Sequence, residues 1–185
     1  SGAPEVLALA QGAREVSEAV IDNSDYIQFT GSSATGAKVM ERAARRLTPV
    51  SLELGGKDPM IVLEDADVEL AANAAVWGGM FNAGQTCVSV ERVYVLEQVY
   101  DKFVEAVVRD VNNLKMGAGE GFDFGALIDD SQVDVTARHV DDALAKGARA
   151  LTGGTRPTGV GSFYPPTVLV DVDHSMACMT DETFG

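Results

Sequence analysis

Short apolar runs alternate along this chain with longer stretches in which apolar residues recur every three or four positions. Short runs are typical of strands. The longer stretches, such as the one that places Phe103, Val107 and Val111 on one face, are typical of helices that pack on a sheet. This alternation predicts an α/β fold with a partly parallel sheet. The expected strands are residues 26–29, 50–54, 60–63, 92–96, 148–151 and 167–170, and the expected helices are residues 34–47, 67–81, 100–114 and 131–146.

The first unit of this pattern is a strand, a helix and a second strand between residues 26 and 54. Ser33 is the expected N-cap of the helix, because a serine side chain accepts a hydrogen bond from the first helical turn. Pro49 cannot continue the helix and separates it from the second strand. The composition of residues 55–59, Gly-Gly-Lys-Asp-Pro, predicts a break between elements.

The charge balance excludes one class of function. Lys and Arg total 14 and Asp and Glu total 28, so the formal net charge of the 185 residues is −14. A nucleic-acid-binding protein needs a basic surface that displaces counterions from phosphates, and this composition supplies none. Hydrophobic residues make up 46% of the chain, which is enough for a folded core. We therefore expect an acidic, folded protein with no nucleic-acid partner.

Cysteine and histidine usage indicates the compartment and the absence of a metal. Cys87 and Cys178 form no CxxC pair, so neither a disulfide framework nor a zinc site is expected. His139 and His174 have no metal-ligand spacing, and both are expected to be solvated surface residues. No apolar run approaches the roughly 20 residues of a membrane-spanning helix. A cytoplasmic protein without a membrane partner is the expectation.

Glycines mark the turn between the first expected strand and helix, in Phe29-Thr30-Gly31-Ser32-Ser33-Ala34-Thr35-Gly36. Glycine lets the backbone approach a ligand closely, and a helix N-terminus offers free N–H groups to phosphate. The segment matches neither the P-loop nor the GxGxxG pattern. Taken alone, it supports a phosphate site no more strongly than an ordinary turn.

Glu53 lies between two leucines at the end of the second expected strand, in Leu52-Glu53-Leu54-Gly55-Gly56-Lys57. Apolar surroundings would raise the pKa of its carboxyl toward the range of a general base. The alternative is an outward-facing glutamate on an edge strand, and Glu53 taken alone favours this alternative.

Cys87 lies in a polar loop at residues 82–89, where a substrate could reach it. Most single cysteines are instead buried and inert, and taken alone Cys87 favours that interpretation. Cys178, between Ala177 and Met179, shows even less sign of reactivity.

Taken together and in order, these segments and the last residues of the chain resemble the aldehyde dehydrogenase superfamily. The resemblance covers essentially the whole chain. Because coincidence would have to operate at every motif, it outweighs the separate interpretations of Glu53 and Cys87. The matching segments are Phe29-Thr30-Gly31-Ser32, Leu52-Glu53-Leu54-Gly55-Gly56-Lys57, Gly84-Gln85-Thr86-Cys87 and Glu182-Thr183-Phe184-Gly185.

The resemblance implies an oxidoreductase that converts a small-molecule aldehyde to a carboxylic acid with NAD or NADP. Cys87 would attack the aldehyde carbon, hydride would pass to the nicotinamide, and Glu53 would activate the water that hydrolyses the thioester. Glu182 would bind the nicotinamide ribose and Phe184 would position the ring. The implied cofactor-binding residues are Gly31, Ser32, Gly36, Leu54, Gly55, Glu182 and Phe184, with Gln132 near the same ribose.

The resemblance also implies a domain organisation. Residues 1–54 would be the C-terminal part of a Rossmann-like NAD(P)-binding domain, and residues 55–185 a catalytic domain truncated at its C-terminus. The asparagine of the family's oxyanion hole would lie upstream of residue 1. We therefore expect this fragment to be inactive by itself and the full-length enzyme to be a homo-oligomer.

Two alternatives remain open. One is a catalytically silent structural or binding relative, which the presence of both Glu53 and Cys87 disfavours. The other is a cysteine esterase or acyltransferase that uses no nicotinamide. Which aldehyde is oxidised is not fixed by the sequence, although residues 85–89 resemble members that act on succinate semialdehyde and similar small aldehydes.

Overall fold

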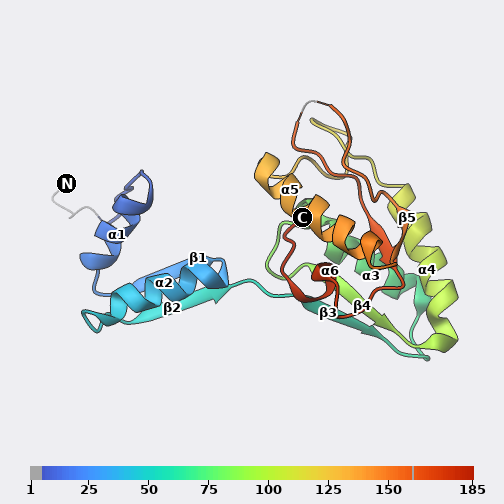
Figure 1. Cartoon of the computed structure of the whole chain (residues 1–185), viewed down its shortest axis with the longest axis horizontal. Coiled ribbons are helices and arrows are strands. Elements are labelled where there is room, and N and C mark those ends of the chain that lie inside the picture. Colours follow the sequence, from blue (N-terminus) through green and yellow to red (C-terminus); the bar gives the residue numbers. More distant parts are fainter. Residues whose placement is uncertain (1–5, 160) are drawn as a thin grey trace. The chain divides into compact units, whose positions relative to one another are not determined.

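The chain divides after Gly55 into two units, residues 1–55 and 56–185 (Figure 1). The computed structural model describes residues 6–159 and 161–185. Helices and strands alternate in both units, so the α/β class expected from the hydrophobic pattern is confirmed. The expected domain boundary followed residue 54, one position before the division in the structure.

The first unit is built around two parallel strands and one helix that lies along them (Figure 1). The strands pair in register from Ile27 opposite Val50 to Gly31 opposite Leu54. A small core of Ile27, Val39 and Ala43 joins the helix to the strands. The elements are α1 (Arg14–Asp22), β1 (Ile27–Gly31), α2 (Ser33–Ala44) and β2 (Val50–Leu54).

The start of α2 differs from the expectation by one residue. Ser32, and not Ser33, is the N-cap: its backbone is extended at φ −67° and ψ 147°, and its side chain accepts a hydrogen bond from Thr35 N–H at 3.3 Å. Ser33 already belongs to the helix. Two adjacent serines offer the same capping chemistry, and only the backbone path decides which of them caps.

The second unit begins with two parallel strands and two helices that share one core. Val62, Ala72, Val99, Phe103 and Ala106 are buried together. This core confirms the amphipathic pattern that predicts a helix around Phe103. The elements are β3 (Asp58–Val62), α3 (Val68–Met80), the 3₁₀ turn η1 (Phe81–Gly84), β4 (Val90–Val95) and α4 (Glu97–Asn112).

The expected break at residues 55–59 is too long by two residues, because Asp58 and Pro59 belong to β3. The register against β4 shifts between Asp58 and Pro59. Proline has no N–H to donate to the sheet, so it is tolerated at an irregular strand start such as this one.

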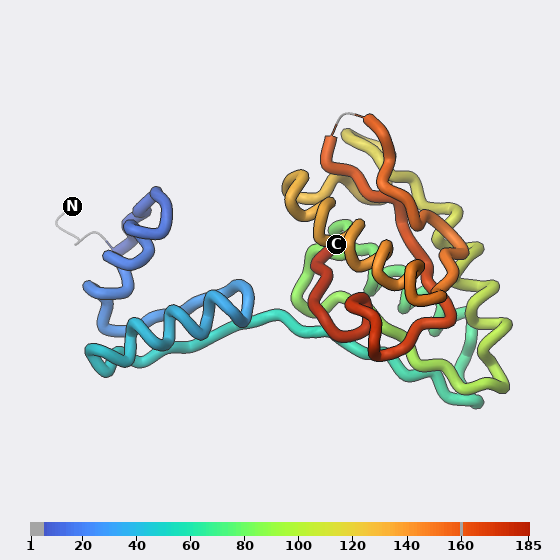
Figure 2. The backbone as a smooth tube through the Cα atoms, in the orientation of Figure 1, coloured from blue at the N-terminus to red at the C-terminus, as the bar shows by residue number. Residues whose placement is uncertain are grey.

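The remaining elements pack α5 against an antiparallel strand pair and a short C-terminal helix. The pair of β5 and β6 contributes Leu169 to the buried cluster of Ala143, Ala148, Met176 and Met179. Figure 2 follows the last residues from α6 to the C-terminus. The sequence did not predict α6, because four residues are too few to show helical periodicity. The elements are α5 (Asp130–Ala145), β5 (Arg149–Thr152), β6 (Val168–Val170) and α6 (Ala177–Thr180).

Within residues 6–159 and 161–185, every helix is too short or too polar to span a lipid bilayer. The same residues contain no cluster of three or more His, Cys, Asp or Glu side chains able to hold a metal ion.

Candidate active site

Cys87 lies in an ordered loop and its side chain is exposed. Two reciprocal hydrogen bonds close the loop: Asn82 Nδ2 donates to the Gln85 carbonyl and Gln85 Nε2 donates to the Asn82 carbonyl, both at 3.1 Å. Gln85 Oε1 also accepts from the Ile128 N–H at 2.8 Å. The thiol is therefore accessible on a loop that side-chain amides hold in place.

The loop starts with three successive residues in the left-handed region. The φ angles of Asn82, Ala83 and Gly84 are 53°, 56° and 76°. Alanine adopts this conformation at an energetic cost, and residues held in it are concentrated at functional sites. The backbone is thus bent sharply just before the segment that carries Cys87.

Gly84 brings the Cys87 loop against the C-terminal segment. A Cβ atom on Gly84 would lie 3.0 Å from the carbonyl carbon of Gly185, closer than nearly all real Cβ contacts. Two motifs singled out in the sequence, Gly84–Cys87 and Glu182–Gly185, therefore meet backbone to backbone.

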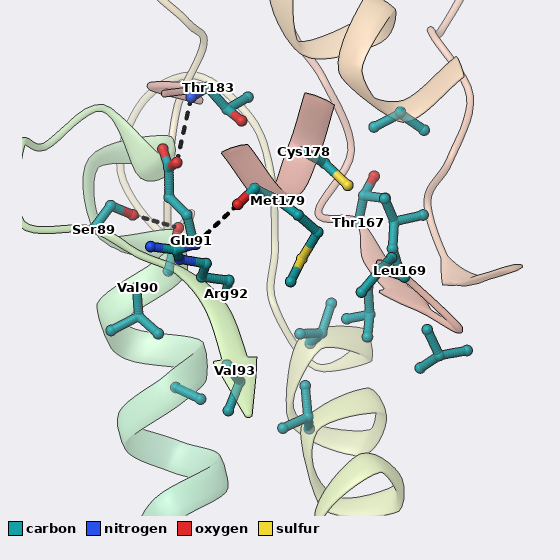
Figure 3. Close-up of a pocket in the computed structure, with 18 of the residues that line it drawn as sticks. Ser89, Val90, Glu91, Arg92, Val93, Thr167, Leu169, Cys178, Met179 and Thr183 are labelled. Atoms are coloured by element: carbon teal, nitrogen blue, oxygen red, sulfur yellow. Dashed lines mark hydrogen bonds between the residues drawn. The ribbon is translucent and has the colours of Figure 1, made fainter. Parts of the chain in front are cut away.

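The C-terminal segment is anchored at Thr183, whose N–H donates to Glu91 (Figure 3), and Glu91 belongs to a buried ion pair. Lys57 Nζ lies 2.5 Å from Glu91 Oε2, and the two side chains are only 5% and 10% exposed. Lys57 Nζ also donates to Thr183 Oγ1 at 2.8 Å. Glu91 accepts from the N–H groups of Thr183 at 3.3 Å and Phe184 at 3.0 Å.

Two side chains of α5 complete the contacts of Thr183. Gln132 Nε2 donates to the Thr183 carbonyl at 2.6 Å, and His139 Nδ1 lies 3.0 Å from Thr183 Oγ1. The resemblance placed Gln132 near the nicotinamide ribose. In this structure its amide nitrogen donates to the backbone carbonyl of Thr183.

His139 is 6% exposed, so the expectation that it is a solvated surface residue is wrong. His139 lies three residues after the buried Thr136 and four before the buried Ala143, so helical spacing places it on the inward face of α5. Burial, followed by the charge of Lys57, lowers the pKa of the His139 imidazole. A neutral ring can accept a hydrogen bond at Nδ1 from the Thr183 hydroxyl. His174 is exposed, and its Nε2 lies 2.9 Å from the Tyr94 hydroxyl.

Glu182 and Phe184 flank the anchored Thr183. Burial raises the pKa of the Glu182 carboxyl, and the nearby charge of Glu91 adds to the rise, while a hydrogen bond from the Gly56 backbone opposes it. Phe184 is 37% exposed and has a left-handed backbone at φ 59°. Glu182 is thus partly buried and Phe184 exposed, next to the contact between Gly84 and Gly185.

The glycines of the first unit have packing roles that the structure makes visible. A Cβ on Gly36 would come within 2.8 Å of Leu54 Cδ2, so a side chain at this position would require the Leu54 side chain to move. A Cβ on Gly31 would meet the Phe29 ring at 2.7 Å. Ser32 uses its side chain to cap α2.

Glu53 lies on β2 opposite Thr30 of β1, and its side chain is exposed on its own unit. This exposure agrees with the outward-facing alternative that Glu53 taken alone favours. Leu54 and Gly55, which follow it, are half-buried.

A cavity of about 620 Å³ in the second unit borders the anchored segment (Figure 3). Thr183 and Gly185 line it together with Lys57, Glu91 and His139, whereas Cys87 and Glu182 are not among its lining residues. In the sequence, Lys57 and Thr183 stand out only as members of longer motifs, and no local pattern distinguishes Glu91.

The sequence matches the model of the Aldehyde dehydrogenase family over residues 2–185. A Mycobacterium ulcerans protein, assigned by its name as a succinate-semialdehyde dehydrogenase (NADP+), is 47% identical over 173 residues, covering 92% of this chain and 33% of the relative.

Two solved structures are similar as well. The succinate-semialdehyde dehydrogenase of Burkholderia pseudomallei superposes with a TM-score of 0.92 at 37% identity, covering 96% of this chain and 38% of that one. A betaine aldehyde dehydrogenase of Staphylococcus aureus, in complex with NAD+, gives a TM-score of 0.86 at 36% identity, covering 92% and 35%. The chain thus spans about a third of the length of the curated relatives it matches.

Proposed function

The chain belongs to the aldehyde dehydrogenase family, and from this membership we propose that the full-length protein oxidises an aldehyde to a carboxylic acid with NAD+ or NADP+. The observation that supports the proposal most directly is the contact between Gly84 and Gly185, which sets the exposed Cys87 loop beside the segment of Glu182 and Phe184. A nucleophile and a dinucleotide-binding segment must be neighbours for hydride to leave a substrate held on the nucleophile.

Cys87 is the proposed nucleophile. Its thiolate forms a C–S bond with the aldehyde carbon, and the carbonyl oxygen gains a proton to give a thiohemiacetal. Bound NAD(P)+ supplies the acceptor for the hydride that leaves this carbon. The substrate then remains on Cys87 as a thioester, and the hydroxyl proton is released.

Glu53 is the proposed general base for the second half of the reaction. Its carboxylate takes a proton from water as the water oxygen bonds to the acyl carbon. The C–S bond breaks, the carboxylic acid leaves, and Cys87 recovers its thiolate. The exposed position of Glu53 on β2 is compatible with a role toward solvent-borne water.

The residues proposed to hold the dinucleotide fit that role. The Glu182 carboxyl receives a backbone hydrogen bond from Gly56 and keeps further lone pairs for the hydroxyls of a ribose. Phe184 offers an accessible ring face. In the first unit, α2 begins after Gly31 and Ser32 and contains Gly36 in its first turn, and its N-terminus would offer N–H groups to a pyrophosphate. Leu54 and Gly55, at the end of β2, would lie on the nicotinamide side.

Succinate semialdehyde is the first substrate we propose. The names of the Mycobacterium ulcerans and Burkholderia pseudomallei proteins support it, as does the resemblance of residues 85–89. The name of the first protein specifies NADP+, and the Staphylococcus aureus structure contains NAD+.

Four further features of the protein stay predictions. They are residues 1–54 as the cofactor domain, residues 55–185 as the catalytic domain, the cytoplasmic location and the homo-oligomeric state.

The test is a pair of cysteine variants in the full-length protein. Cys87→Ser should reduce succinate-semialdehyde-dependent NAD(P)H formation by a factor of at least about 10³, because the C–S bond can no longer form. Cys178→Ser is the matched control, since Cys178 is half-buried on α6 and burial raises the pKa of its thiol. Turnover of Cys87→Ser at the rate of Cys178→Ser would overturn the proposal.

A further inference from the structure

Every polar group of Thr183 is engaged by a side chain that the proposed chemistry does not use. Its N–H donates to Glu91, its carbonyl accepts from Gln132, and its hydroxyl contacts Lys57 and His139. These four side chains come from the segment before β3, from β4 and from α5. Side chains from three separate segments of the second unit thus converge on Thr183.

The hydrogen-bond polarity around the Thr183 hydroxyl is self-consistent. An ammonium can only donate, so Lys57 Nζ donates to Oγ1. The hydroxyl proton is then available to His139 Nδ1 at 3.0 Å in the neutral tautomer that is protonated at Nε2. The two contacts hold Thr183 Oγ1 between Lys57 and His139.

Glu91 of the Lys57–Glu91 ion pair binds backbone N–H groups of the C-terminal segment. Glu91 Oε1 accepts the N–H of Phe184, whose φ of 59° is unusual for a bulky residue, and Glu91 Oε2 accepts the N–H of Thr183. A buried ion pair is weak evidence for stability, because apolar side chains of similar volume often stabilise a core as well. In this structure the Lys57–Glu91 pair instead fixes the orientation of the peptide groups between Glu182 and Phe184, because Glu91 accepts both of their N–H groups.

We propose that Lys57, Glu91 and Thr183 are positioning residues that hold Glu182 and Phe184 in place for the nicotinamide riboside half of the dinucleotide. The inference rests on the proposed function, which assigns that ligand to Glu182 and Phe184. The Lys57–Glu91 pair fixes the backbone of Thr183 and Phe184 through the hydrogen bonds to Glu91. Because Thr183 is bonded to Glu182 and Phe184, fixing it also fixes the positions of these two neighbours. Cys87 takes no part in these hydrogen bonds.

Two pairs of variants of the full-length protein test the proposal. Thr183→Val removes only the hydroxyl and keeps the shape, while Thr183→Ser keeps the hydroxyl and serves as the rescue. Lys57→Met removes the buried ammonium, and Lys102→Met is its control, because Lys102 is exposed on α4. The measurements are kcat, the KM values for the dinucleotide and for succinate semialdehyde, and amide hydrogen exchange of Thr183 and Phe184. The alkylation rate of Cys87 by iodoacetamide reports separately on the thiol.

A loss of positioning should change only dinucleotide binding and the exchange of the two amides, whereas a loss of folding should change every measured quantity. Thr183→Val and Lys57→Met should raise the KM for the dinucleotide and the exchange rate of the two amides by about tenfold or more, which corresponds to losing one charge-assisted hydrogen bond. The KM for the aldehyde and the alkylation rate of Cys87 should change less than about twofold, and Thr183→Ser should restore most of the dinucleotide affinity. The Lys102→Met control should behave as the unmodified protein.

Two outcomes would overturn the inference. One is a KM for the dinucleotide within twofold of the unmodified protein in Thr183→Val. The other is a parallel loss of Cys87 alkylation and dinucleotide affinity, which indicates general disruption. If the unmodified protein oxidises no aldehyde, the proposed function fails instead. Calorimetric binding of NAD+ and NADP+ to the same variants then decides the positioning inference: unchanged affinity rejects it and a tenfold loss supports it.

Discussion

Gly84 and Gly185 touch through their backbones: a side chain on Gly84 would begin 3.0 Å from the carbonyl carbon of Gly185. This contact joins the loop of Cys87 to the segment of Glu182 and Phe184. The site therefore depends on the absence of a side chain as much as on the reactive groups, and its geometry is sensitive to a single methyl group.

Gly84→Ala should disrupt this contact. The residue has φ 76°, so alanine is strained there, and its Cβ would collide with Gly185 and with the Gly79 carbonyl oxygen. We expect a loss of about 1–3 kcal/mol in the free energy of unfolding and a fall in aldehyde turnover of the full-length protein. Urea denaturation and steady-state kinetics measure the two effects.

Gly121→Ala is the matched control for this change. Gly121 has a similar φ of 86°, but a Cβ there would meet nothing within 4 Å. It should show the backbone strain without the collision and keep its turnover. Equal turnover in Gly84→Ala and Gly121→Ala would contradict a role for the Gly84–Gly185 contact.

Glu53→Gln should stop the reaction after the hydride has left. An amide cannot take the proton of the attacking water, so the acyl group should accumulate on Cys87. Intact-mass spectrometry after mixing the full-length variant with NAD(P)+ and succinate semialdehyde should show one acyl adduct per chain and a burst of NAD(P)H.

Glu41→Gln is the control in the same unit, since Glu41 is exposed on α2 and lies 3.7 Å from Arg45 as a surface ion pair. It should turn over normally without an adduct. Steady turnover by Glu53→Gln with no adduct would assign the hydrolytic base to another residue.

His139 should make the protein less stable as the pH falls. Burial and then the charges of Lys57 and Arg138 lower the pKa of its imidazole, while Asp181 and Glu91 act in the opposite direction. A lowered pKa means that the unfolded state binds the proton more tightly, so stability rises with pH. The contribution is complete above the ordinary histidine pKa of about 6.5 and is lost as the pH drops below it toward the folded-state pKa.

Unfolding midpoints of the full-length protein between about pH 5 and pH 8 measure this effect, in the range where histidine titrates. His139→Asn should flatten the dependence, because asparagine offers an oxygen to Thr183 and does not titrate. His174→Asn, at an exposed position, should leave it unchanged. A slope that survives in His139→Asn would assign the titration to another group.

The 185 residues by themselves should bind NAD(P)+ weakly and show negligible aldehyde oxidation. They span about a third of the relatives that they match. Isothermal calorimetry and an NAD(P)H assay on these 185 residues check this, and substantial turnover would contradict the prediction.

The agreement between sequence and fold is closest where the determining forces are local. Asp67 begins α3 by capping its first turn, and residues 50–54 form β2 with the expected bounds. The differences arise where two residues offer equal local chemistry, as at Ser32 and Ser33, or where a neighbouring strand admits Pro59 at a register shift.

The residues of the candidate site also fall into two groups, those that the sequence identified and those that only the fold brought together. The sequence by itself determined the α/β class, because periodicity and turn composition are properties of neighbouring residues. Its ordered motifs made Cys87, Glu53, Glu182 and Phe184 candidates only through their resemblance to the aldehyde dehydrogenase family. Only the tertiary structure decided that Gly84 meets Gly185 and that Lys57, Glu91 and His139 converge on Thr183. A hydrogen bond between residues distant in the chain depends on how elements pack, and packing leaves no local pattern in the sequence of either partner.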